Sequence, residues 1–138
     1  MIPRTTLWAT ALIMAAVAGC SGPSYEIAEV DGVVKVKGQP MKGLFLQFLP
    51  ENGPTSIAET DDAGRFRLQY RDPKTNTMKD GAVVGKHRVV VMDAERPSVA
   101  QGEEPKPGRI PDKYSDMVKS PLTQEIRSGP QSIEILID

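Results

Sequence analysis

The sequence has almost none of the side chains that carry thiol, metal and nucleophilic chemistry. Its 138 residues include one cysteine, Cys20, and one histidine, His87. A lone cysteine cannot close an internal disulfide, and zinc sites built from histidine and cysteine need three or four such ligands. Nucleophilic catalysis that uses a histidine as the general base would depend on this single residue. We therefore expect no disulfide, no metal and no cofactor, and the composition favours a protein that is not an enzyme.

Charge of one sign and aromatic side chains are also scarce. Lysine and arginine number 17 against 18 aspartate and glutamate residues, which gives a net charge of −1. Without a basic excess, nucleic acid is not an expected partner. The chain has one tryptophan, three tyrosines and three phenylalanines. Carbohydrate sites commonly use exposed aromatic rings, so sugar binding is the less favoured kind of recognition.

Helical patterning is missing as well. No window sustains apolar residues at helical spacing, and twelve prolines and twelve glycines interrupt the chain. Apolar residues instead alternate with polar ones in short runs, which is typical of an all-β sandwich or barrel. We expect one β-sandwich domain over residues 27–138, with two packed antiparallel sheets. Seven runs are predicted as its strands, at residues 30–38, 43–50, 57–60, 65–70, 85–93, 123–127 and 131–138.

The segment Ile57–Tyr70, IAETDDAGRFRLQY, carries the clearest local signal. Two alternating runs flank Asp61, Asp62, Ala63 and Gly64, and a four-residue connection ending in glycine suits a type I turn with Gly64 at positive φ. We predict a β-hairpin here, with the Asp61 side chain capping the turn. The two aspartates lack the alternating spacing of a calcium-binding loop, so a solvated turn is favoured over a cation site.

The N-terminal segment contains the only long apolar run. Leu7–Val17 is apolar except for Thr10 and follows Arg4. A membrane-spanning helix needs about 20 apolar residues. The run is shorter than that, so it is predicted to be the core of a signal peptide.

The residues that follow, Val17-Ala18-Gly19-Cys20, resemble the lipobox of bacterial lipoproteins. This resemblance implies cleavage before Cys20 and attachment of a diacylglycerol to its sulfur. Residues 1–19 would then be the signal peptide and residues 20–26 a short lipidated tether. Two or more acyl chains are needed for stable anchoring. The alternative is an ordinary secretory signal followed by a free thiol.

A second resemblance covers roughly Val30–Met92. The patterns V-x-G-x-V, G-x-P, F-x-P and T-D-x-x-G-x-F are present, and GKHRVVV fits G-x-Y-x-V with His87 at the aromatic position. The chain is thereby similar to carboxypeptidase regulatory-like domains. That family implies a seven-stranded antiparallel Greek-key sandwich of transthyretin (prealbumin) type, used mostly as an accessory module and implying no activity. The matched residues are Val30, Gly32, Val34, Gly38, Pro40, Gly43, Phe48, Pro50, Thr60, Asp61, Gly64 and Phe66.

Three side chains are candidates for contact with a ligand or partner: His87, Lys113 and Tyr114. His87 lies in the middle of a predicted strand, where a core-edge position is the favoured interpretation. Tyr114 lies in the segment IPDKY, and we expect it to pack a loop back onto the sandwich. Two polar segments, Arg71–Asp80 and Asp93–Arg109, lack strand periodicity and are predicted to be loops.

The sequence as a whole predicts a lipoprotein of the bacterial cell envelope. It would be held in a membrane through acylated Cys20 and face the periplasm or the exterior, with the outer membrane one candidate. The expected role is a non-enzymatic structural or interaction module that binds an envelope protein or polysaccharide through sheet edges or the two loops. The alternative is a carbohydrate-binding accessory module or a subunit of an envelope enzyme.

Overall fold

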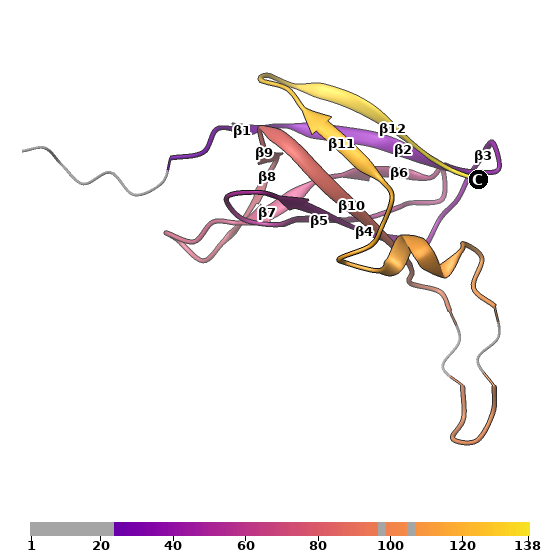
Figure 1. The fold of residues 1–138 in the computed structure, drawn as a ribbon. Helices are drawn as coiled ribbons and strands as arrows, with labels where there is room; N and C mark the ends of the chain where they lie inside the picture. The colour runs from indigo at the N-terminus through magenta and orange to yellow at the C-terminus, as the bar shows by residue number, and fades with distance from the viewer. Residues whose placement is uncertain (1–23, 97–98, 105–106) are drawn as a thin grey trace, which may run out of the picture.

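The computed structural model describes residues 24–96, 99–104 and 107–138, which form a six-stranded and a four-stranded β-sheet packed face to face and a small two-stranded sheet (Figure 1). The predicted signal peptide and the predicted lipidation site, Cys20, lie outside these residues. Within the described ranges there is no α-helix, only the short 3-10 helix η1 (Asp112–Ser115). No helix in this part of the chain is long and apolar enough to span a membrane.

The larger sheet has six strands in the order β11-β10-β4-β5-β7-β8. The strand β4 lies inside this sheet, between β10 and β5. Together with the small β1–β9 pair, this sheet accounts for most of the strands. Their bounds are β1 (Ile27–Ala28), β4 (Leu44–Pro50), β5 (Ser56–Glu59), β7 (Gln69–Arg71), β8 (Met78–Asp80), β9 (Ala82–Val83), β10 (Gly85–Asp93) and β11 (Thr123–Ile126).

The smaller sheet is built around β2 (Val30–Val36), which pairs with three other strands. On one side lies β12 (Gln131–Ile137), and on the other side lie β3 (Gln39–Pro40) and β6 (Arg65–Arg67). The pairing of β2 with β12 is parallel, with Ile133 beside Gly32. The sheet is therefore mixed, and the expectation of purely antiparallel pairing was wrong for this pair.

Side chains on the inner faces of the two sheets form the core. The alternation predicted for β2 is confirmed, because Val30, Val34 and Val36 are buried. Across the sandwich, the ring of Phe48 on β4 lies 6.3 Å from the ring of Phe66 on β6, measured between centroids. Burial of such apolar side chains contributes about 1.5–3 kcal/mol each. All seven predicted runs contain at least one strand, so the all-β sandwich is confirmed.

The predicted hairpin Ile57–Tyr70 is only partly correct. Its turn forms as expected, with Gly64 at φ +71° and the Gly64 amide donating to the Asp61 carbonyl. After the turn, however, β6 leaves β5 and pairs with β2 in the other sheet. The chain then returns, and β7 pairs with β5 at Ile57–Gln69. The hairpin crosses between sheets because this path buries the apolar side chains of Phe66 and Leu68 in the core between the two sheets.

The segment Arg71–Asp80 is not a plain loop, which corrects a second expectation. β8 pairs with β7, so the segment is a short hairpin around Asp72–Thr77. An ion pair between Lys79 Nζ and Asp72 Oδ2, 2.5 Å apart, ties the two strands together. The hydrogen bond from Lys79 lowers the pKa of Asp72 and raises that of Lys79. The polar composition therefore reflects two exposed strands rather than an absence of structure.

Candidate functional site

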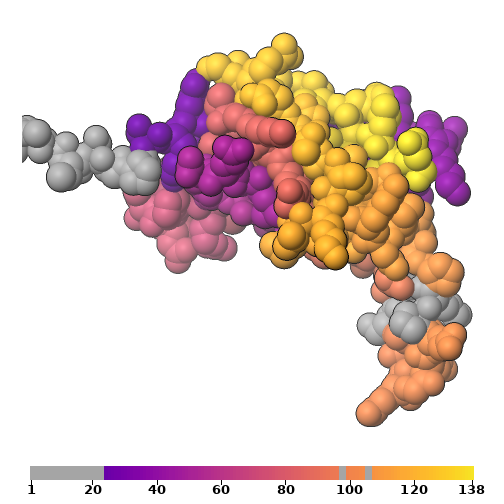
Figure 2. All heavy atoms as spheres, in the orientation of Figure 1, coloured from indigo at the N-terminus to yellow at the C-terminus, as the bar shows by residue number. Residues whose placement is uncertain are grey.

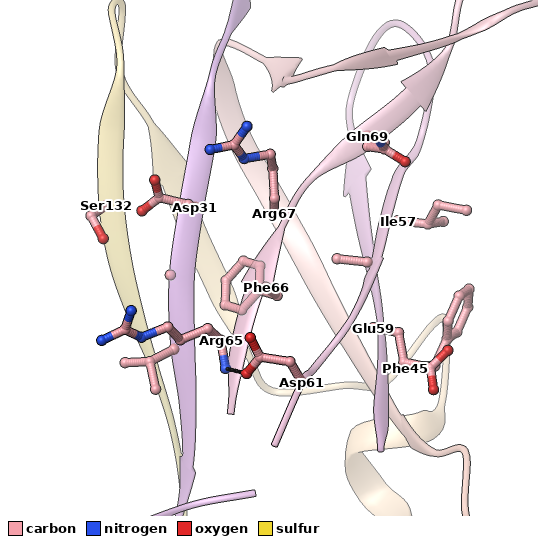
Figure 3. Close-up of a pocket in the computed structure, with 13 residues that line it drawn as sticks. Asp31, Phe45, Ile57, Glu59, Asp61, Arg65, Phe66, Arg67, Gln69 and Ser132 are labelled. Atoms are coloured by element: carbon pink, nitrogen blue, oxygen red, sulfur yellow. Dashed lines mark hydrogen bonds between the residues drawn. The ribbon is translucent and has the colours of Figure 1, made fainter. Parts of the chain in front are cut away.

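A broad hollow on the described surface lies where the hairpin divides. It has a volume of about 970 Å³ and opens between β5 of the larger sheet and β6 of the smaller one (Figure 3). The hairpin is closed at the turn, where the Asp61 amide donates to the Arg65 carbonyl, and again at the Ile57–Gln69 pair. Between these two points the strands separate. We call this hollow the split-hairpin groove.

The turn at the end of the groove is rigidly built. Asp61 Oδ1 accepts hydrogen bonds from the amides of Ala63 and Arg65, both at 2.9 Å. Gly64 is required here, because a Cβ at this residue would lie 2.9 Å from the Val34 carbonyl oxygen and its φ is positive. The Asp61 carboxylate is thus occupied by the turn, as the sequence predicted, and is not a free ligand.

The inner wall of the groove depends on close contact between β2 and β6. Phe66 lies against the backbone at Gly32, where an added Cβ would be 2.7 Å from the Phe66 ring and 2.3 Å from the Ile133 carbonyl oxygen. Phe66 is only 4% exposed. Phe45 and Ile57, both half-buried, line the opposite wall on the larger sheet. Apolar side chains from both sheets therefore form part of the groove's lining.

Charged side chains stand on both walls of the groove. Arg65 and Arg67 rise from β6, while Asp31 and Glu59 come from β2 and β5 (Figure 3). Arg67 lies 3.9 Å from Asp80, an exposed pair of small energetic value. Arg65 makes no ion pair with any described residue. Both signs of charge are available to a bound molecule beside these apolar side chains.

A second built feature joins Asp93 to Arg109, on the side of the sandwich from which the described residues 99–104 project (Figure 2). Arg109 Nη2 lies 2.6 Å from Asp93 Oδ1, and the same guanidinium donates to the carbonyls of Lys42 and Gly43. Asp93 also accepts from the amides of Glu95 and Arg109. The Arg109 hydrogen bonds outweigh burial and lower the pKa of Asp93 to about 2. The two residues are therefore clamped together at ordinary pH.

The three candidate residues from the sequence do not line the groove. His87 is fully buried, with its ring 5.8 Å from that of Phe48, and Nε2 lies 2.6 Å from the Val83 carbonyl oxygen. Its Nδ1 has no hydrogen-bond partner in the described part of the chain. Such a side chain reaches no partner unless the core opens. The histidine occupies the place of a core aromatic.

Tyr114 and Lys113 lie on η1, which packs against β10. Tyr114 is 5% exposed and belongs to the core cluster, so the prediction that it packs the segment onto the sandwich is confirmed. The chain after η1 is also bonded to β10, because Ser120 Oγ donates a hydrogen bond to the Val89 carbonyl at 2.6 Å. Lys113 is exposed, with its Nζ 4.9 Å from the centre of the Tyr114 ring.

The polar residues that β6 and β7 contribute to the groove were visible in the sequence but were not singled out. Arg65, Arg67 and Gln69 share the polar face of one predicted strand. The missing information was that this face turns toward a gap between two sheets and not toward open solvent. Among the described residues, no three histidine, cysteine, aspartate or glutamate side chains gather as a metal site.

Comparison of the chain with protein-family models, with curated proteins and with solved structures found no match.

Proposed function

We propose that this protein is an envelope lipoprotein that acts as a non-enzymatic interaction module. In this proposal residues 1–19 are removed, acylated Cys20 anchors the chain in a membrane, and the sandwich belongs to the transthyretin-like carboxypeptidase regulatory-like domains. The lipobox-like VAGC segment supports the anchor. The seven predicted runs, each with a strand, and the sequence patterns they contain support the family.

The observation that carries the binding role is the split-hairpin groove. Its walls are strands of two sheets, with Arg65, Arg67 and Asp31 on the smaller sheet and Glu59 on the larger one. A site on rigid strands binds without an ordering cost. Opposite charges on the two walls would orient an extended segment with both apolar and charged groups. We propose that an envelope protein segment or polysaccharide binds here.

Charge reversal in the groove tests this proposal. The double variant Arg65→Glu and Arg67→Glu should abolish or strongly weaken capture of envelope partners by the full-length protein in crosslinked envelopes. The matched control is Lys86→Glu, a charge reversal on β10 outside the groove. If the double variant and the control capture the same partners equally well, the groove is not the binding site.

The anchor is tested separately. Cys20→Ala should prevent labelling with radioactive fatty acid and leave the uncleaved precursor. A mature wild-type protein without lipid would contradict the anchor, whatever the groove binds.

A further inference from the structure

A sheet edge normally exposes backbone groups that can pair with another strand, and proteins protect such edges with short strands, charge or proline. Four edges in this structure follow that rule. β3 has two residues and ends in Pro40, β6 has three and carries two arginines, β8 has three and contains Lys79 and Asp80, and β11 has four. β12 is the exception.

β12 is a seven-residue edge strand with the sequence QSIEILI. It pairs with β2 on one side and with no described strand on the other. It contains no proline, no lysine and one charged side chain, Glu134. That charge is matched by Lys35 Nζ at 3.1 Å on the neighbouring strand. The strand is thus long, regular and nearly free of the devices that prevent pairing.

The hydrogen bonds show which backbone groups are open. The Gln131 amide donates to the Glu29 carbonyl, and the Ile137 carbonyl accepts from the Lys37 amide. In a parallel ladder, alternate residues of one strand make both bonds to the other. Odd-numbered residues of β12 therefore bond to β2. The N–H and C=O groups of Ser132, Glu134 and Leu136 point away from it, along the free edge.

The side chains along this edge define what can bind. Ile133 faces inward but remains half-buried, whereas Leu136 faces outward and is 58% exposed. The strand lies on the upper rim of the molecule, uncovered in this view (Figure 2). An added strand would satisfy three N–H and three C=O groups. Its alternate apolar side chains would cover Ile133, and a basic side chain on its other face would lie near Glu134.

We propose that the free edge of β12 is a strand-addition site for an extended segment of another polypeptide, with alternating apolar and polar side chains. A second copy of this chain is the other candidate occupant. Glu26, the last residue of the proposed tether, accepts a hydrogen bond from Ser128 just before β12, so this end of the tether lies beside the start of the strand. An antiparallel second copy would point its own tether away from the membrane.

We favour another polypeptide over a second copy as the occupant because of the proposed lipid anchor. The proposal that a strand pairs with the free edge of β12 does not depend on that anchor. Strand addition at β12 also does not depend on Arg65 and Arg67 of the split-hairpin groove, because β12 and β6 lie on opposite sides of β2 and only Ser132 of β12 borders the groove. The two binding proposals can therefore fail separately.

The test uses the mature full-length chain in detergent and a capped synthetic peptide, TVKVTVKT, that alternates valine with threonine and lysine. Glu134→Pro removes one N–H of the free edge and leaves the ladder to β2 intact. Glu134→Ala is the matched control, since it removes the same charge and keeps the N–H. Binding is measured by titration, and the site is located from the amide exchange rates of β12.

We expect the peptide to slow exchange at Ser132, Glu134 and Leu136 in the wild type. The proline variant should bind about tenfold more weakly than the alanine variant. If Glu134→Pro does not fold, Leu136→Pro takes its place, with Leu136→Ala as its control. Unchanged exchange at these amides, or equal binding by the two variants, would overturn the proposal. Concentration-dependent protection without peptide would identify a second copy as the occupant and overturn it as well.

Discussion

The two sides of β2 present very different surfaces. On one side, β6 is short, carries two arginines and is closed by a turn in which Asp61 caps two amides. On the other side, β12 runs for seven residues with its outer backbone groups unpaired by any described strand. The first side presents a groove lined by side chains, whereas the second offers unpaired backbone groups.

The difference shows how one sheet can support two kinds of recognition. Side chains on the β6 side can select a partner by charge and shape, because its backbone groups are used locally. The β12 side can accept any strand of suitable alternation, because hydrogen bonds to the backbone carry little sequence information. Four predictions test this difference between the two sides of β2, beginning with the largest expected effect.

The largest effect is expected at Gly32, which joins the two sides. Gly32→Ala would place a Cβ 2.3 Å from the Ile133 carbonyl oxygen of β12 and 2.7 Å from the Phe66 ring of β6. We expect about 3 kcal/mol lower free energy of unfolding in urea titrations, because both strands must shift. Gly38→Ala is the control, since it meets nothing within 4 Å and adds only strain at φ +80°. Equal losses in the two variants would show that Gly32 does not fix both strands.

The next effect concerns the clamp between Asp93 and Arg109, which lies apart from both sides of β2. Asp93→Asn should lower the free energy of unfolding by about 1–2 kcal/mol at neutral pH. The folded pKa of about 2 is below the ordinary value of 3.8. The contribution of the carboxylate is therefore complete above about pH 4 and disappears as the pH falls toward 2.

Urea titrations of the wild type and Asp93→Asn between pH 2 and pH 7 measure this difference. The two stability curves should run parallel above about pH 5 and converge below pH 4. A gap that stays constant down to pH 2 would mean that the charge of Asp93 contributes nothing. Exchange rates in β6 and β12 should remain those of the wild type.

A smaller effect is expected at the turn that closes the groove. Asp61→Ala removes the acceptor of two backbone amides and should cost about 1 kcal/mol in stability. The amide of Arg65 should then exchange faster, while β12 amides keep their rates. Asp62→Ala is a suitable control, because the structure gives that side chain no hydrogen bond. A comparable acceleration in both variants would contradict the capping role of Asp61.

Local patterns explain why much of the fold was predictable. Alternation placed the inner residues of β2, β4 and β10 correctly, and the position of Gly64 predicted the turn. These features depend on neighbours in sequence. The crossing of β6 to the other sheet depends instead on distant residues. Phe66 packs against Phe48 and Gly32, which are more than fifteen residues away in the sequence. Short-range signals therefore favoured a simple hairpin.

The candidate site was less accessible to prediction for the same reason. The groove needs β2, β5 and β6 together, and the clamp needs Asp93 to meet Arg109 across a long segment. The parallel pairing of β12 with β2 leaves no trace in alternation, since parallel and antiparallel edge strands share a period of two. His87 was a candidate contact residue because it is the only histidine, yet its side chain is buried in the core.

The smallest effect is expected at the free edge. Glu134→Ala breaks an exposed ion pair with Lys35 and should change stability by less than about 0.5 kcal/mol. Thermal unfolding of this variant beside Lys35→Ala measures it. A loss above about 1 kcal/mol in either variant would mean that the charge pair, and not the backbone ladder, holds β12 in place.

Residue-resolved amide exchange of the free full-length protein tests the contrast between the two sides most directly. The amides of Ser132, Glu134 and Leu136 should exchange quickly, while those of Ile133, Ile135 and Ile137 on the same strand, and the amide of Arg65 at the groove turn, should exchange slowly. Uniformly slow exchange along β12, or rapid exchange at Arg65, would contradict an open edge on one side of β2 and a closed one on the other.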